Sequence, residues 1–73
     1  MQHQHYKGYL VRAISTKFGV KEKDNGDEWY PTVEVYKDGK RLIIEWTRPI
    51  RGTLERADEV ALANGKSWID KQI

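Results

Sequence analysis

The dipeptide Asp38-Gly39 lies between two runs of β-branched and aromatic residues, in the stretch VEVYKDGKRLIIEW (residues 33–46). Asp-Gly is favoured in two-residue type I′ turns, whose backbone twist matches that of the two strands they join. The pattern therefore predicts a β-hairpin. Counting outward from this turn pairs Tyr36 with Arg41 and Val35 with Leu42.

This register assigns each residue of the hairpin to one of two faces, because successive side chains of a strand point to opposite sides. The first face is expected to form the core and carries Pro31, Val33, Val35, Leu42, Ile44 and Trp46. The second face carries Tyr30, Thr32, Glu34, Tyr36, Arg41, Ile43 and Glu45. Since Pro31 has no amide hydrogen, we expect it beyond the end of the first strand's pairing or at a bulge.

A further strand is predicted upstream, within YKGYLVRAISTKF (residues 6–18). Val11 and Ala13 are expected to point inward, because Arg12 on the alternate side is the costlier residue to bury. The charged stretch GVKEKDNGDE (residues 19–28) is typical of a loop and joins this strand to the hairpin. The result is a three-stranded antiparallel meander.

The segment ADEVALANGKSWID (residues 57–70) has the spacing of an amphipathic helix, which we expect to run from about Leu54 to Lys71. Thr53 is the expected N-cap, and Glu55 in the first turn complements the helix dipole. The stripe expected to face the sheet comprises Ala57, Val60, Ala61, Asn64, Gly65 and Trp68. A second stripe comprises Leu62, Ile69 and Ile73, and it is expected to wrap the sheet edge or to meet a second subunit.

Gly65 lies near the middle of this predicted helix, where glycine costs about 1 kcal/mol relative to alanine. Together with Ala57 and Ala61 it forms a row of small residues that lets the helix approach the sheet closely. Gly65 therefore lowers the helix propensity of this segment but allows the helix to pack closely against the sheet. The alternative is that Asn64-Gly65 ends one helix and starts another.

These elements predict an α+β fold in which a three-stranded β-meander is packed on one face by a single C-terminal helix. We expect residues 1–73 to form a single domain, with residues 1–5 disordered. The chain has no cysteine, no apolar run near the roughly 20 residues of a membrane span and no signal-peptide pattern, so we expect a cytoplasmic protein.

No pattern in the sequence predicts an enzyme, a cofactor, a metal site or a small-molecule substrate. His3 and His5 lack the further ligands that a folded metal site needs. Glu34 and Glu45 are expected on one exposed face beside Arg41, where a cross-strand ion pair is favoured over an acid/base pair. The serines and threonines have no histidine partner in a plausible triad.

One helix can cover only one side of a three-stranded sheet, so the other side should stay open. Because aromatic residues are enriched at interfaces, this open side is a candidate surface for a homodimer or another protein partner. The residues predicted to bind there are Tyr30, Tyr36, Arg41 and Ile43.

The alternative is binding of double-stranded DNA. Its predicted residues are Arg12, Arg41, Arg48, Arg51 and Arg56, several of which surround the start of the helix. The order of elements resembles that of the plant AP2-type and phage-integrase amino-terminal DNA-binding domains. The segments that carry this resemblance are YKGYLVRA, WYPTVEVY and RLIIEWT, followed by the helix. That resemblance implies a three-stranded sheet lying in the major groove. The net charge of +2 and the two glutamates on the same predicted face argue against such a surface.

The closing pattern, small residues followed by GKSWID (residues 65–70), is similar to that of small uncharacterised bacterial proteins with an Ala-rich C-terminal helix ending in Trp-Ile-Asp. This resemblance implies a stand-alone bacterial protein and no activity.

Overall fold

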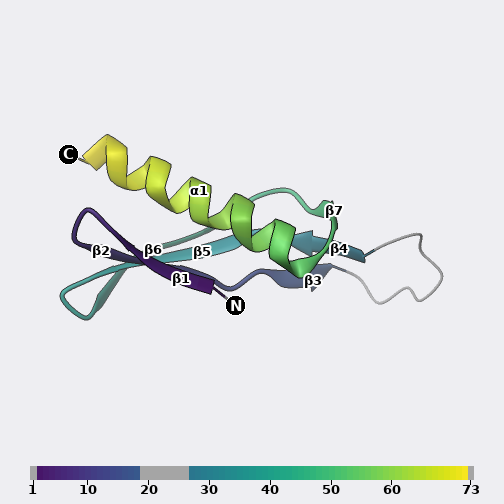
Figure 1. Cartoon of the computed structure of the whole chain (residues 1–73), viewed down its shortest axis with the longest axis horizontal. Coiled ribbons are helices and arrows are strands. Elements are labelled where there is room, and N and C mark those ends of the chain that lie inside the picture. Colours follow the sequence, from purple (N-terminus) through teal and green to yellow (C-terminus); the bar gives the residue numbers. More distant parts are fainter. Residues whose placement is uncertain (1, 19–26, 73) are drawn as a thin grey trace.

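The computed structural model describes residues 2–18 and 27–72, which form strands and then one long helix. In chain order the elements are β1 (Gln2–Tyr6), β2 (Tyr9–Ala13), β3 (Thr16–Phe18), β4 (Asp27–Tyr30), β5 (Thr32–Lys37), β6 (Lys40–Trp46), β7 (Ile50–Gly52) and α1 (Leu54–Gln72). One antiparallel sheet has the order β1-β2-β5-β6 and a smaller one has the order β3-β4-β7. Helix α1 runs along one side of both sheets (Figure 1).

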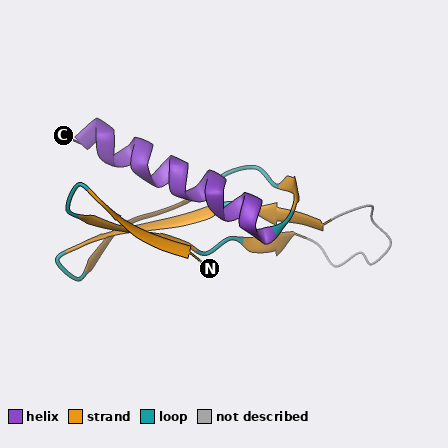
Figure 2. Ribbon diagram, viewed as in Figure 1, coloured by secondary structure: helices purple, strands orange, loops and turns teal. Residues whose placement is uncertain are grey.

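An α+β fold with one C-terminal helix on antiparallel strands is therefore confirmed, whereas the three-stranded meander is wrong. The described residues contain seven strands in two sheets. Two pairing strands are absent from the sequence prediction: β1, which forms a hairpin with β2, and the short β7, which pairs with β4. Figure 2 shows the helix lying along the strands of the larger sheet, with the short β7 beside the start of the helix.

The N-terminal hairpin corrects the expectation that residues 1–5 are disordered. Strand β1 pairs with β2 in a register that places Gln4 opposite Val11 and Tyr6 opposite Tyr9. Between them, Lys7 and Gly8 both have positive φ, at 52° and 86°. Two successive positive φ angles are the requirement of a type I′ turn, and Gly8 meets it without strain.

The expected first strand is divided into β2 and β3 at Ser15. Its hydroxyl accepts a hydrogen bond from the amide of Thr32 at 3.4 Å, while the amide of Ile14 donates to the Thr32 carbonyl at 2.8 Å. Pro31 is buried between β4 and β5, outside the ladder, as its missing donor requires. Of the predicted loop, residues 19–26 lie outside the described residues, and Asp27 and Glu28 belong to β4.

The second hairpin begins as predicted and then departs from the predicted register. Asp38 and Gly39 have φ of 53° and 79°, and Tyr36 pairs with Arg41. A β-bulge follows, so that Val35 pairs with Ile43 and Leu42 is the extra residue. One inserted residue moves every later side chain to the opposite face.

The bulge reverses the predicted faces of β6. Ile43 lies opposite Val35 and packs against the core, whereas Ile44 lies opposite Glu34, on the side away from the helix. Trp46 lies opposite Thr32 on that same side and is 65% exposed, and Leu42 is 44% exposed. The predicted core positions Leu42, Ile44 and Trp46 are therefore wrong.

Helix α1 is continuous from Leu54 to Gln72, so the alternative of a break at Asn64-Gly65 is wrong. Thr53 is the N-cap: its hydroxyl accepts from the Arg56 amide at 3.1 Å, and its carbonyl accepts from the Ala57 amide at 3.1 Å. The predicted start of the helix is confirmed.

The buried side of α1 is centred on Gly65. An added Cβ at this position would lie 2.7 Å from Val11 Cγ1 and 2.9 Å from Val33 Cγ2. Real Cβ atoms do not approach other atoms this closely, so the predicted packing role of Gly65 is confirmed. Val11 and Ala13 are both fully buried, which confirms the predicted phase of β2.

The helix is rotated relative to the predicted stripe by roughly 70° at 100° per residue. Leu62 and Ile69, expected at the sheet edge, belong to the buried core, while Val60 and Trp68 are only partly buried. Closest approach at Gly65 determines this rotation, because large side chains must then lie on either side of it. Ile73 lies outside the described residues.

Candidate functional site

The sheet side turned away from α1, called the open face below, is the main uncovered surface of the strand layer (Figure 2). Val11, Val33 and Val35 point toward Gly65, so the residues that alternate with them point away from the helix. The open face comprises His3, His5, Leu10, Arg12, Ile14, Thr16, Tyr30, Thr32, Glu34, Tyr36, Arg41, Ile44 and Trp46.

An apolar groove crosses the open face where β2 and β5 of the larger sheet continue into β3 and β4 of the smaller one. We call it the Trp46 groove; its volume is about 410 Å³, and its lining residues are Ile14, Thr16, Tyr30, Thr32, Ile44 and Trp46. Trp46 is 65% exposed and Ile44 is 40% exposed. Large apolar side chains this exposed and this close together are typical of contact surfaces.

A charged network lies beside the groove and is centred on Glu34. The side chain of Arg41 donates from Nη1 to Glu34 Oε2 at 2.9 Å, and Tyr36 Oη donates to Oε1 at 3.0 Å. Arg12 Nη1 lies 3.7 Å from Oε1. Only 7% of Glu34 is exposed, because these three side chains cover it.

The network confirms the predicted ion pair between Glu34 and Arg41 and corrects its surroundings. Glu34 is buried, not exposed, and Glu45 lies opposite Val33 on the helix side. The bulge therefore separates the two glutamates onto opposite faces. A pair of carboxylates for acid/base chemistry does not form between them.

Three of the four residues predicted for protein binding lie on the open face: Tyr30, Tyr36 and Arg41. Ile43, the fourth, packs against the core under the helix, so its predicted place on the open face is wrong. Trp46 is a surface residue that the sequence does not predict, because an unbulged register places it in the core. The Lys40–Trp46 strand gives no sequence signal for a bulge beyond its unusual apolar continuity.

The arginines of the DNA-binding alternative do not form one cluster. Arg12 and Arg41 share Glu34, whereas Arg51 on β7 lies 3.5 Å from Glu28 and Arg56 on α1 lies 3.9 Å from Glu59. Arg48 is exposed in the connection between β6 and β7. Four of the five arginines therefore already face a carboxylate.

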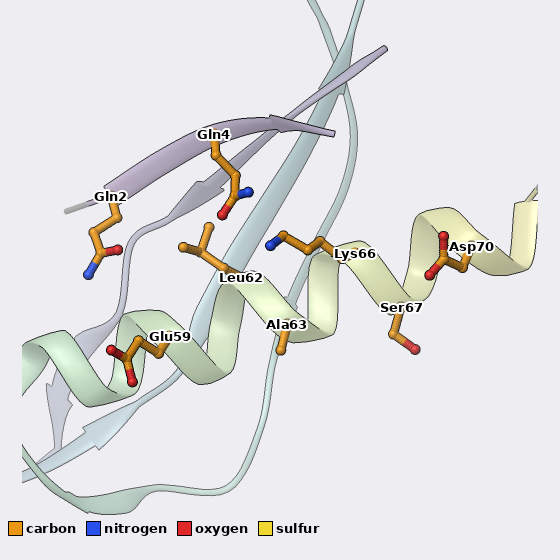
Figure 3. Close-up of a pocket in the computed structure, with 8 residues that line it drawn as sticks. All are labelled: Gln2, Gln4, Glu59, Leu62, Ala63, Lys66, Ser67 and Asp70. Atoms are coloured by element: carbon orange, nitrogen blue, oxygen red, sulfur yellow. The ribbon is translucent and has the colours of Figure 1, made fainter. Parts of the chain in front are cut away.

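A second groove lies on the other side of the molecule, between β1 and α1 (Figure 3). It has a volume of about 510 Å³ and is lined by Gln2, Gln4, Glu59, Leu62, Ala63, Lys66, Ser67 and Asp70. Lys66 extends toward Leu62 and Gln4, while Ser67 points away from β1 (Figure 3). These polar groups do not converge on one point (Figure 3).

Near the end of this groove, Asp70 connects the helix to the β1–β2 turn. It accepts hydrogen bonds from Lys7 Nζ at 2.8 Å and from Tyr6 Oη at 3.0 Å. The hydrogen bond from Lys7, followed by that from Tyr6, lowers the pKa of Asp70. The same hydrogen bond to Asp70, together with its charge, raises the pKa of Lys7.

Two further observations concern the described parts of the chain, residues 2–18 and 27–72. They contain no group of three or more histidine, cysteine or acidic side chains arranged to hold a metal ion. His3 and His5 are exposed on β1. In those same ranges, no helix has the length and apolar character needed to cross a membrane.

The fold and the open face define a small α+β domain in which a C-terminal helix covers one side of two short antiparallel sheets. The family model described as "Domain of unknown function (DUF6566)" matches residues 1–73, so the chain belongs to this family. No curated protein and no solved structure matches the chain.

Proposed function

We propose that this chain is a non-enzymatic protein-interaction module and that the open face is its binding surface. The observation that carries the proposal is the position of Trp46, 65% exposed at the rim of an apolar groove. Tryptophan and tyrosine contribute a large part of the binding energy at protein interfaces. Trp46 and Tyr30 together provide this chemistry.

Burial of the exposed surface of Trp46 by a partner would contribute substantially to the free energy of binding. At 65% exposure, a tryptophan side chain leaves about 160 Å² in water. Burying that area is worth about 4 kcal/mol at roughly 25 cal/mol per Å². Ile44, which is 40% exposed on the same face, adds to it. A partner that covers the Trp46 groove therefore gains affinity mainly from apolar burial.

The Glu34 network supports the same function through its polar atoms. Its carboxylate already accepts hydrogen bonds from Tyr36 and Arg41, so covering it with a partner leaves no unpaired carboxylate behind. Arginine and tyrosine are also enriched at interfaces. An apolar groove beside a paired polar network is the usual composition of a protein interface.

Duplex DNA is the second candidate, and one observation favours it. The bulge brings Trp46 to the same face as Arg12 and Arg41, which places an aromatic ring and two guanidinium groups on one surface. Phosphate contacts, however, require cationic groups that can leave their present partners. Because Arg12 and Arg41 both face the buried Glu34, the local charge favours a protein partner over DNA.

A photocrosslinker at the groove separates the two candidates. We would replace Trp46 with p-benzoylphenylalanine, which keeps an aromatic ring, and irradiate cells that produce the chain. The matched control carries the same residue in place of Glu55, which is exposed in the first turn of α1. We expect discrete protein adducts from position 46 only. Nucleic-acid adducts, no adducts, or the same adducts from both positions would contradict the proposal.

A further inference from the structure

We infer that the occupant of the open face is a second copy of this chain, with Trp46 of each copy inserted into the Trp46 groove of the other. The inference rests on the proposed function and specifies its partner. A two-fold axis makes each contact occur twice, so the surface must be complementary to itself. The open face meets this condition in its shape, its charge and its area.

Shape is the first argument. Trp46 projects into solvent at the rim of a groove whose other walls are Ile14, Tyr30 and Ile44. A projecting aromatic side chain and an apolar groove of about 410 Å³ therefore lie side by side on one surface. Rotation by 180° about an axis between them can bring each tryptophan to the groove of the other copy.

Charge is the second argument. Two identical faces that carried unpaired charge of one sign would repel each other. Here the central carboxylate of Glu34 is held by both Arg12 and Arg41, so these three residues leave the open face with one more cation than anion. One excess charge, spread over two guanidinium groups that each face a carboxylate of their own copy, causes only a weak repulsion between two such faces.

Area is the third argument. A standard interface buries about 800 Å² on each partner. This is about one sixth of the 5156 Å² surface of the chain. In a two-layer molecule, the outer side of the strand layer can supply this share. Two such sides pack at about 10 Å, as in β-sandwiches.

The small core gives a reason for the monomer to associate. Among the described residues, the largest fully buried apolar side chains are Ile69 and the valines Val11, Val33 and Val35. Of the aromatic residues of the groove, Trp46 is instead exposed and Tyr30 is only half-buried. Chains of about 70 residues seldom gain enough stability from such a core, and association is one of the usual remedies.

The test is sedimentation equilibrium on the purified full chain, carried out over a wide range of concentrations. We expect the wild type to form a dimer and Trp46→Ala to weaken it by about 30-fold or more, as for a central interface tryptophan. Leu42→Ala is the matched control, because Leu42 is also an exposed apolar residue of β6 but does not line the groove. It should leave the dimer unchanged.

A second variant keeps the test decisive if Trp46→Ala fails to fold. Thr16→Arg adds a long charged side chain at an exposed position of the groove and should also weaken the dimer. Circular dichroism identifies which variants are folded. A dimer that tolerates the groove variants, or one that Leu42→Ala weakens equally, would overturn the inference.

A wild type that stays monomeric at every concentration would also overturn the inference. It would leave the proposed function intact if position 46 still crosslinked to a different protein in cells. Absence of both the dimer and the crosslinks would overturn both proposals, so the two failures are distinguishable.

Discussion

Gly65 lies directly against Val11, so that a Cβ atom at position 65 would be 2.7 Å from Val11 Cγ1. The two residues are far apart in the chain, and their contact sets the distance between helix α1 and the sheet. It also sets which side of the helix is buried, because only a residue without a side chain fits at the point of closest approach.

Gly65→Ala should destabilise the protein, although alanine is the better helix former by about 1 kcal/mol. The added methyl group would clash with Val11 and Val33 in a tightly packed interface. Overpacking of this kind costs about 1–3 kcal/mol. Chemical denaturation measures the loss.

The double variant Gly65→Ala with Val11→Ala is the control for this explanation. Removing the valine methyl groups relieves the clash, so the double variant should lose less stability than the sum of the two single variants. Simple additivity, or a stabilising effect of Gly65→Ala alone, would show that the helix does not pack at this distance.

Ile43→Ala should cost about 2 kcal/mol, and Ile44→Ala less than about 1 kcal/mol, when unfolding is measured at high dilution. The two isoleucines are adjacent in β6, but the bulge places Ile43 against the core and leaves Ile44 40% exposed. The pair therefore tests the register with matched substitutions. The reverse order of stability losses would indicate an unbulged hairpin.

The sequence predicted the local elements better than their pairing. The Asp38-Gly39 turn, the Thr53 cap, the helix and the inward side of β2 follow from local propensity and from the cost of burying Arg12. The N-terminal hairpin was missed because alternating Gln and His has little apolar character. Its pairing with β2 depends on tertiary contacts and on the Lys7-Gly8 turn.

Glu34→Ala should destabilise the protein by about 1–3 kcal/mol, because Tyr36 and Arg41 each lose a hydrogen bond to a charged acceptor. The partial exposure of Arg41 keeps the loss moderate, since its guanidinium can turn to water. Glu45→Ala is the matched control on the opposite face, where the glutamate is exposed. Thermal unfolding of both variants should show a clear loss only for Glu34; equal losses would mean that the network is not a stabilising unit.

The contacts between Asp70 and Lys7 contribute to folding stability in a way that depends on pH, and the direction follows from the two pKa shifts. Because the folded-state pKa of Asp70 is lowered, its contribution to stability is present above the ordinary aspartate pKa and is lost as the pH falls through the folded value. Because the pKa of Lys7 is raised, its contribution is present below the ordinary lysine pKa and is lost as the pH rises through the folded value. Both contributions are complete at neutral pH.

Carbon-detected NMR titration of the Asp70 carboxyl group tests whether its pKa is lowered in the folded protein. Its midpoint should lie below the ordinary value in the wild type and should rise in Lys7→Ala, with a smaller rise in Tyr6→Phe, which keeps the ring but removes the hydroxyl. A midpoint that does not respond to either change would show that the three side chains do not interact in solution.

The candidate site was less predictable than the fold, and the extra residue Leu42 at the bulge in β6 accounts for the difference. Tyr30, Tyr36 and Arg41 precede the bulge or lie on β4, so counting from the turn placed them correctly. Beyond Leu42 the count is displaced by one residue, which exchanged Ile43 for Trp46 on the open face. A bulge depends on how a strand fits its neighbours and the helix, and these contacts are not visible in a local pattern.

The bulge turns Trp46 to the face opposite α1, and both proposals depend on this orientation. Nuclear Overhauser effects from the Trp46 indole, recorded on dilute monomeric protein, test it most directly. We predict contacts with groove residues such as Ile44 and Tyr30 and none with α1. Contacts from the indole to Ala61 or Gly65 would place Trp46 beneath the helix and contradict the account.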